Sequence, residues 1–283
     1  MDRLVFNAAA IVAHQAISRQ MHTNELANLS TTGFKASYDV AMQSIKTDGK
    51  GFDTRFQPEL VEKDIIKMTP GPLMVTGNPL DVAMQDATVL GVQAPNGELA
   101  FTRRGDLRVN ATGVLETGDG NIVRGEDGPI TVPQGFHLSI NRDGSIYASD
   151  PSQAGVQNEQ LIGKLLLRDS SNTPLRRRED GLFRVDQMPS GSDIPATDKT
   201  PSLIAQTLEG SNINAIDAMT KMIFYARTFE TQIRIIKDAK EIDSSGATMT
   251  NVVVSPRPAP AWTAARAIAD PRPHARRDGV PRQ

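Results

Sequence analysis

The sequence contains no cysteine, and this absence excludes several kinds of site. Without a thiol there can be no disulfide bond, no thiolate metal ligand and no cysteine nucleophile. The absence names no compartment, but it suits a chain that is exported unfolded, because no thiol can pair wrongly on the way. With 283 residues, 39% of them hydrophobic, the chain is still long enough to bury a substantial core.

Long apolar runs are absent as well. No stretch of about 18 apolar residues occurs, so we expect no transmembrane helix and no direct membrane insertion. The chain begins Met1, Asp2, Arg3, and the apolar stretch that follows is broken by Asn7 and His14. A cleavable signal peptide has a positively charged start and an uninterrupted apolar segment, so we expect none here.

The net charge is small, at −2, but it is unevenly distributed. Residues 256–283 carry six Arg and two Asp, which leaves the preceding 255 residues with a net charge of −6. A mildly acidic main body argues against nucleic-acid binding, which would have to rest on the Arg-rich tail alone. The basic run at 176–178 is followed at once by Glu179 and Asp180, so we interpret it as a solvated strand end.

Motifs for catalysis or metal binding are scarce. The four histidines are scattered, and eight residues separate His14 from His22, too far along a helix for one metal. The glycine-rich stretches at 118–120 and 125–128 have neither Walker spacing nor alternating oxygen ligands, so hairpin turns explain them better. We expect no metal, cofactor or catalytic site. The paired carboxylates of a carbohydrate-active enzyme meet only in space, so that alternative stays open.

Residues 3–29 are predicted to form a helix, because no Pro or Gly interrupts them and apolar residues, among them Val5 and Val12, form one broad face. The second half of this helix is more polar, so it needs a partner surface that can hydrogen-bond to amide side chains. Asn24 and Asn28 are i, i+4 and share a face, either to hold register between packed helices or as solvated amides. Gly33 follows where a chain leaving a helix needs freedom in φ.

A second helix is predicted over about 213–245, with Ser211 or Asn212 as its N-cap and Asp217 in its first turn. Its apolar residues are spaced 4, 3, 4, 3, 4, 3 and form a seam that faces a neighbouring helix. Three heptads span only about 30 Å, so this helix is marginal alone and needs a partner, within the same molecule or in a neighbour. The predicted seam comprises Ala215, Met219, Met222, Ala226, Phe229, Ile233 and Ile236.

The middle of the chain is predicted to be all-β. From 77 to 204, short apolar runs alternate with turn pairs that permit positive φ, at 96–97, 112–113, 119–120, 127–128, 143–144 and 180–181. Candidate strands are 99–103, 107–109, 122–124, 130–132, 137–140, 146–148, 163–167 and 182–185.

These elements predict an α+β protein in which the N- and C-terminal helices pack together in a coiled-coil-like pair, with an all-β domain inserted between them. Residues 1–35 and 205–251 would form one discontinuous helical domain. Residues 36–76 would be an extended connecting segment with an exposed loop at 46–52, and 77–204 the β domain. The Pro- and Arg-rich residues 252–283 are predicted to be a disordered tail.

The stretch from Asn24 to Lys35, NELANLSTTGFK, resembles the N-terminal signature of the flagellar rod and hook family, Asn-Asn-Leu-Ala-Asn-x-x-Thr-x-Gly-Phe. Glu25 stands where the family usually has a second Asn. Residues 77–83, GNPLDVA, and 101–106, FTRRGD, look like the entry to the family's β domain, although Val89-Leu90 replaces a usual aromatic pair. Residues 208–214, LEGSNIN, are similar to the start of the family's C-terminal helix.

The resemblance covers about residues 1–250 and implies a non-catalytic subunit of the bacterial flagellum. Such a subunit is exported by the flagellar type III apparatus and joins the helical rod of the basal body, which crosses the periplasm. Its partners would be copies of itself, other rod subunits and the export apparatus, with no nucleic acid and no small-molecule substrate. The start of the chain and residues 68–71, 128–133 and 180–183 look most like proximal-rod members, with distal-rod and hook members as alternatives.

The resemblance also implies which residues lie at the assembly interface. Its terminal helices would form an inner tube and its β domain an outer layer. Besides Val5, Val12 and the predicted seam, the matching motif positions expected there are Asn24, Leu26, Ala27, Asn28, Thr31, Gly33, Phe34, Asn212 and Asn214.

Overall fold

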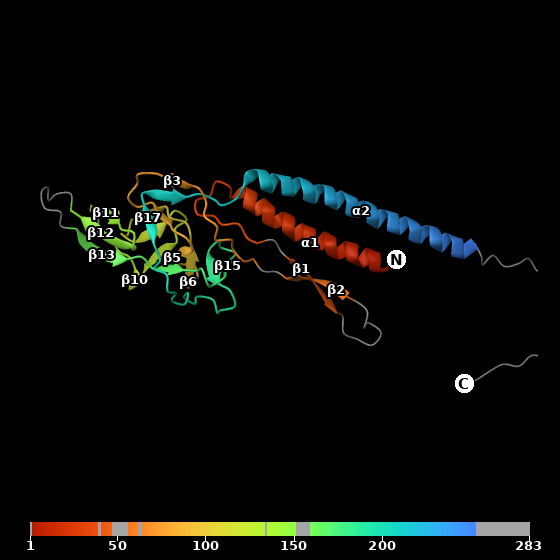
Figure 1. Cartoon of the computed structure of the whole chain (residues 1–283), viewed down its shortest axis with the longest axis horizontal. Coiled ribbons are helices and arrows are strands. Elements are labelled where there is room, and N and C mark those ends of the chain that lie inside the picture. The colour runs from red at the N-terminus through yellow and green to blue at the C-terminus, as the bar shows by residue number, and fades with distance from the viewer. Residues whose placement is uncertain are drawn as a thin grey trace, which may run out of the picture.

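A computed structural model describes residues 2–38, 41–46, 56–61, 64–133, 135–150 and 159–252. A pair of antiparallel helices extends from a β-rich body (Figure 1). Helix α1 (Asp2–Ala27) runs toward the body and α2 (Ala215–Val252) runs away from it, side by side with α1. Neither helix combines the length and hydropathy that a membrane span requires.

Helix α1 agrees with the predicted helix to within two residues at its C-terminal end. The chain then leaves it through residues 30–35, which we call the signature loop. Gly33 in this loop has φ of 68°, a left-handed conformation that favours glycine, as predicted.

Helix α2 begins and ends later than predicted, and its cap differs. The Asn214 side-chain oxygen accepts the Ile216 and Asp217 amides at 2.9 and 3.4 Å, so Asn214 is the N-cap. The prediction of Ser211 or Asn212 as the cap was wrong, because the preceding residues are held by the β body. The predicted tail begins at the last residue of α2, and its remainder, 253–283, lies outside the described residues.

Among the described residues, the largest sheet of the β body has nine strands with antiparallel pairing. Its order is β15-β16-β6-β5-β9-β8-β7, with β10 paired to β9 and β14 paired to β5. The strands are β5 (Thr88–Gln93), β6 (Leu99–Thr102), β7 (Leu107–Val109), β8 (Leu115–Thr117), β9 (Ile122–Gly125), β10 (Gly128–Pro129), β14 (Leu167–Asp169), β15 (Leu175–Arg177) and β16 (Phe183–Val185).

Smaller antiparallel units complete the body and connect it to the helices. One sheet contains β11 (His137–Ile140), β12 (Ser145–Ser149) and β13 (Gln160–Lys164). The strand pairs are β4 (Val82–Met84) with β17 (Leu203–Ala205), β3 (Leu73–Val75) with β18 (Thr207–Glu209), and β1 (Ala41–Lys46) with β2 (Phe56–Val61). Residues 36–76 therefore hold strands, not only the extended connection that was predicted. Of the predicted loop at 46–52, residues 47–52 lie outside the described part.

The core of the body lies around β5, where five of the six residues are buried. Leu90, Val92 and Leu115 belong to one buried apolar cluster, and Val89 and Phe101 belong to a second. The strand prediction missed β5, because a strand buried on both faces shows no alternation of apolar and polar residues.

Most of the predicted turns and strands are present. The glycine of every predicted turn pair has a positive φ, namely Gly97, Gly113, Gly120, Gly128, Gly144 and Gly181. Two strand predictions fail: 130–132 forms only an isolated bridge, and 163–167 is divided between β13 and β14. The α+β class is confirmed.

Candidate assembly interface

The two helices contact each other along a face that is more polar than predicted. Among the side chains described, the buried residues are Gln15, Ser18, His22 and Glu25 on α1 and Ala218, Gln232 and Ala239 on α2, with Tyr225 half-buried. The spacings of 3, 4 and 7 are those of a coiled-coil stripe. We call these residues the inner seam.

His22 lies at the centre of a polar cluster in the inner seam. Its Nδ1 is 2.7 Å from Glu25 Oε2, and its ring stacks on Tyr225 with centroids 5.4 Å apart. The other Glu25 oxygen accepts the Ser37 amide at 3.2 Å. Glu25, the departure from the family signature, therefore ties α1 to the segment that follows the signature loop.

Two amide side chains lie one step further along the inner seam. Gln15 precedes His22 by seven residues on α1, and Gln232 follows Tyr225 by seven residues on α2. The side-chain oxygens of Gln15 and Gln232 are buried, and no described residue donates a hydrogen bond to them. Burying such oxygens costs free energy, so this part of the seam holds the helices together weakly.

The seam predicted on α2 is turned partly away from α1. Ala215, Met222, Ile233 and Ile236 are half-buried, whereas Ala226 is exposed and Met219 and Phe229 are 53% and 38% exposed. On α1, Val12 is half-buried, and the side chain of Val5 lies outside the described part. The prediction that this stripe packs on the other terminal helix is thus correct only for part of it.

Further apolar side chains on α2 face outward, and we call them the outer stripe. Phe224, Ile235, Ile242 and Met249 are all exposed, in addition to Ile216 and Ile223. The sequence prediction missed these four, although the spacing of seven from Ile235 to Ile242 to Met249 is a coiled-coil signal. A helix with apolar residues on two sides needs more than one partner.

The signature loop joins the helices to the β body through its backbone. The Gly33 amide donates to the Glu209 carbonyl at 2.7 Å, and a Cβ at Gly33 would lie 2.3 Å from the Arg103 carbonyl oxygen. The Arg177 guanidinium lies 4.3 Å from the centroid of the Phe34 ring and donates to the Lys35 carbonyl. Gly33 and Phe34 are therefore required for this contact within the subunit.

Three charged side chains make the same connection, and we call them the joint. Lys35, Arg103 and Glu209 have side chains no more than 1% exposed. Lys35 Nζ lies 2.7 Å from Glu209 Oε1, and Arg103 Nε and Nη2 donate to Glu209 Oε2 at 2.8 and 2.6 Å. Arg103 also donates to the carbonyls of Met84 and Thr88, so its charge is well compensated.

The joint carries one more positive than negative charge when Lys35 is protonated. Burial, together with the charge of Arg103, lowers the pKa of Lys35 to about 8, although Glu209 acts in the opposite direction. The joint was not predicted, because its members are far apart in the chain, although each lies in one of the three stretches that resemble the flagellar family.

Asn212 ties three segments together just before α2. Its side-chain oxygen accepts the Ala36 amide at 2.7 Å, and its Nδ2 donates to the carbonyls of Lys67 and Thr69 at 3.0 and 3.2 Å. With Asn214 as the N-cap, both motif asparagines hold contacts within the subunit.

The other motif residues lie on α1 and the signature loop. Asn28 Nδ2 donates to Asn24 Oδ1 at 2.7 Å, and Thr31 donates to Asn28 Oδ1 at 3.1 Å. These three line one wall of a polar groove whose opposite wall belongs to the β body. Leu26 is half-buried, and Ala27 is exposed.

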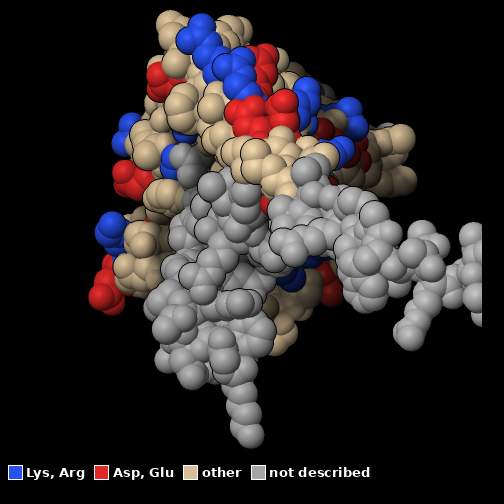
Figure 2. All heavy atoms as spheres, turned by 90° about the vertical axis from the view of Figure 1, so that its right-hand side faces the viewer, with Lys and Arg blue, Asp and Glu red and all other residues tan. Residues whose placement is uncertain are grey.

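The described residues offer no metal site. They contain no group of three or more His, Asp or Glu side chains able to hold a metal ion. Viewed from the free end of the helix pair, the described surface carries Lys and Arg interspersed with Asp and Glu (Figure 2). The conspicuous feature is instead the outer stripe.

The chain matches two family models and several characterised proteins. Residues 87–148 match the flagellar hook protein FlgE/F/G D1 domain, and residues 204–249 match the flagellar basal body rod FlgEFG protein C-terminal region. The flagellar basal-body rod protein FlgF of Salmonella typhimurium is 37% identical over 246 residues, covering 85% of this chain and 95% of that protein. FlgF of Escherichia coli is 36% identical over the same shares.

A relative with another name gives a weaker match. The flagellar basal-body rod protein FlgG of Caulobacter vibrioides is 27% identical over 254 residues, covering 83% of this chain and 94% of that protein. The identities to FlgF, together with the helix pair and the signature loop, decide the assignment. The chain belongs to the family of flagellar basal-body rod proteins.

Proposed function

We propose that this chain is a structural, non-catalytic subunit of the rod of the bacterial flagellar basal body, in its proximal part. The observation that carries the proposal is the outer stripe, a set of exposed apolar side chains on α2 in a chain of this family. Burying such a side chain contributes about 1.5–3 kcal/mol. Neighbouring subunits that cover the stripe would gain this free energy on assembly.

The proposal includes the partners and the location of the chain. Copies of itself and other rod subunits would cover the outer stripe, and the flagellar export apparatus would deliver the chain without a cleaved signal peptide to the periplasmic rod. The helices would order fully on docking, because the polar inner seam holds them weakly before assembly. Higher identity to FlgF than to FlgG supports the proximal position over the distal one.

Complementation tests the function. The chain should restore motility to a strain that lacks its FlgF-type rod protein, and not to one that lacks its FlgG-type protein. Ile235→Asp should abolish the rescue, because a carboxylate in the outer stripe prevents apolar packing between subunits. Thr112→Asp, at an exposed turn of the β body, is the control and should leave motility intact.

Two results would contradict the proposal. One is failure of the unaltered chain to enter basal bodies, measured by immunoblot of the purified structures. The other is normal motility of Ile235→Asp at normal cellular levels.

A further inference from the structure

Strand β3 is an apolar edge strand at the surface of the β body. Among the described residues it pairs only with β18, in a two-stranded sheet. Leu73, Met74 and Val75 are 54%, 48% and 84% exposed, so β3 presents apolar side chains on both of its faces. Exposed edge strands are commonly protected by charged side chains, and the stretch from Met68 to Leu80 contains none.

The hydrogen bonds around β3 show which of its backbone groups are open. The Gly210 amide donates to the Pro72 carbonyl at 2.8 Å, and the Thr76 amide donates at 2.9 Å to the carbonyl of the residue just before β18. Because hydrogen-bonded positions alternate in an antiparallel pair, every second residue from Pro72 onward faces β18. Leu73 and Val75 therefore point their N–H and C=O groups away from β18, toward the open side.

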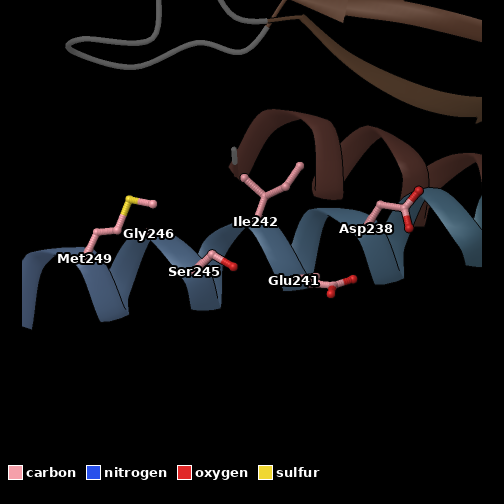
Figure 3. A pocket seen from close by; sticks show the side chains of 6 residues that line it. All are labelled: Asp238, Glu241, Ile242, Ser245, Gly246 and Met249. Carbon is pink, nitrogen blue, oxygen red and sulfur yellow. The ribbon is translucent and has the colours of Figure 1, made fainter.

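This edge adjoins the start of the outer stripe. Pro72, just before β3, and Ile213, just before α2, line the same shallow hollow. Ile216 follows in the first turn of α2 and is 75% exposed. Further along α2 the stripe reaches Ile242 and Met249, whose side chains project to the same side of the helix (Figure 3). The open edge of β3 thus continues the surface that the proposed function assigns to neighbouring subunits.

We propose that the open edge of β3 binds an extended, uncharged segment of a neighbouring rod subunit. The inference rests on the proposed function and adds a contact that lies in the β body, outside the helix pair. Unpaired N–H and C=O groups at alternate positions are complementary to another strand, which would become the third strand beside β3 and β18. A segment without charged side chains fits, because an unpaired charge buried against Leu73 and Val75 would be costly.

Pairing of β3 with the β3 strand of a second copy is the alternative that the geometry disfavours. Such a two-fold contact closes after two copies and does not extend along a helical rod. The open edge is also short, because Pro72 has no N–H and limits it on one side. The strand contact therefore adds to the contacts of the outer stripe and does not replace them.

Proline and threonine at position 75 separate the strand contact from the fold of the subunit. Val75→Pro removes the N–H that points to the open side and leaves the bonds to β18 in place, whereas Val75→Thr keeps this N–H and a β-branched side chain. In a strain that the unaltered chain complements, Val75→Pro should lower the amount of chain in purified basal bodies at least fivefold. Val75→Thr should lower it less than twofold, both at equal cellular levels on immunoblots.

Measurements on the purified full-length subunit supply the controls. The β body of Val75→Pro and Val75→Thr should unfold at the same urea concentration, whereas Met74→Pro should lower that concentration, because the Met74 N–H faces β18. In the dilute unaltered subunit, amide hydrogen exchange followed by NMR should be fast at Leu73 and Val75 and slow at Met74.

Photo-cross-linking identifies the partner even if Val75→Pro fails to fold. p-Benzoylphenylalanine in place of Met74, in the complementing chain, should form a cross-link to a rod subunit in purified basal bodies. Mass spectrometry of the product should locate the cross-link in an uncharged segment of that subunit.

Three results would overturn the strand contact. They are normal incorporation of Val75→Pro, slow exchange at Leu73 and Val75 in the dilute subunit, which would show that the chain covers its own edge, and a cross-link only between the β3 strands of two copies. Complementation separates the two proposals. If the unaltered chain fails to complement, the rod function is removed, and if Val75→Pro complements equally well, only this contact is removed.

Discussion

At the scale of single residues, the joint of Lys35, Arg103 and Glu209 decides how the helices meet the β body. Each of the three comes from a different segment, and Glu209 accepts from both cations. Removing one member of a buried ion pair typically costs about 3–5 kcal/mol, because the remaining charge loses its partner. The signature loop thus contributes only Lys35 to the joint, and its partners Arg103 and Glu209 come from the β body.

Lys35 should make stability depend on pH in alkaline solution. Its pKa falls from 10.5 to about 8 on folding, so between these values the unfolded chain binds more protons than the folded chain. The contribution of Lys35 to the free energy of unfolding therefore rises as pH rises from about 8 to 10.5, by at most about 1.4 kcal/mol per pH unit. Lys35→Met should remove this gain, measured by urea unfolding at pH 7.5, 9 and 10.

The surface variant Lys237→Met is the control, and its difference from the unaltered chain should not change with pH. Other titrating groups cancel in these differences. If the free energies of unfolding of Lys35→Met and of the unaltered chain also differed by the same amount at every pH, the pKa of Lys35 would not be lowered.

At the scale of elements, the inner seam combines coiled-coil spacing with polar contacts. Replacing Gln15 and Gln232 together by leucine removes two buried amide oxygens and adds apolar area, so the helix pair should become more stable by about 1–3 kcal/mol. The check is the helical circular dichroism signal during heating. Gln20→Leu, at an exposed position of α1, should leave the transition unchanged, and a lower transition in the double variant would refute the argument.

Sequence periodicity predicted both helices but only part of how they pack. It located the stripe from Ala215 to Ile236, but it took the most apolar face as the one that meets α1. The structure instead buries Gln232 and Ala239 and exposes Phe229. Hydrophobic periodicity indicates that a helix face packs against a partner. It does not indicate whether that partner lies in the same chain or in another subunit.

Residues that contact each other across long sequence separations escaped prediction. Strand β5 was missed because five of its six residues are buried, and the joint was missed because Lys35 and Glu209 are 174 positions apart. Turn glycines such as Gly97, in contrast, were predicted correctly, because the requirement for positive φ is local.

At the scale of the whole molecule, stability is unevenly distributed between the body and the helix pair. The body buries two apolar clusters, whereas the described inner seam contains polar groups and the outer stripe is open to water. We expect the purified subunit to lose its helical signal at lower temperature than its β structure. Limited trypsin digestion should cut α2 first, at residues such as Arg227 and Lys237, and leave a fragment containing the body.

Two results would contradict this order of unfolding. One is a single thermal transition for helices and β structure, and the other is a helix pair as resistant to trypsin as the body. The leucine double variant supplies an internal check, because it should raise only the first transition.

The antiparallel arrangement of α1 and α2 has a practical consequence for labelling. The first described residue, Asp2, and the end of α2 lie together at the tip farthest from the body (Figure 1). A fluorescent protein fused before Asp2 would therefore be placed at this tip, beside the exposed part of α2. Insertion at the turn of Asn96 and Gly97, in the body, would keep the reporter away from that tip.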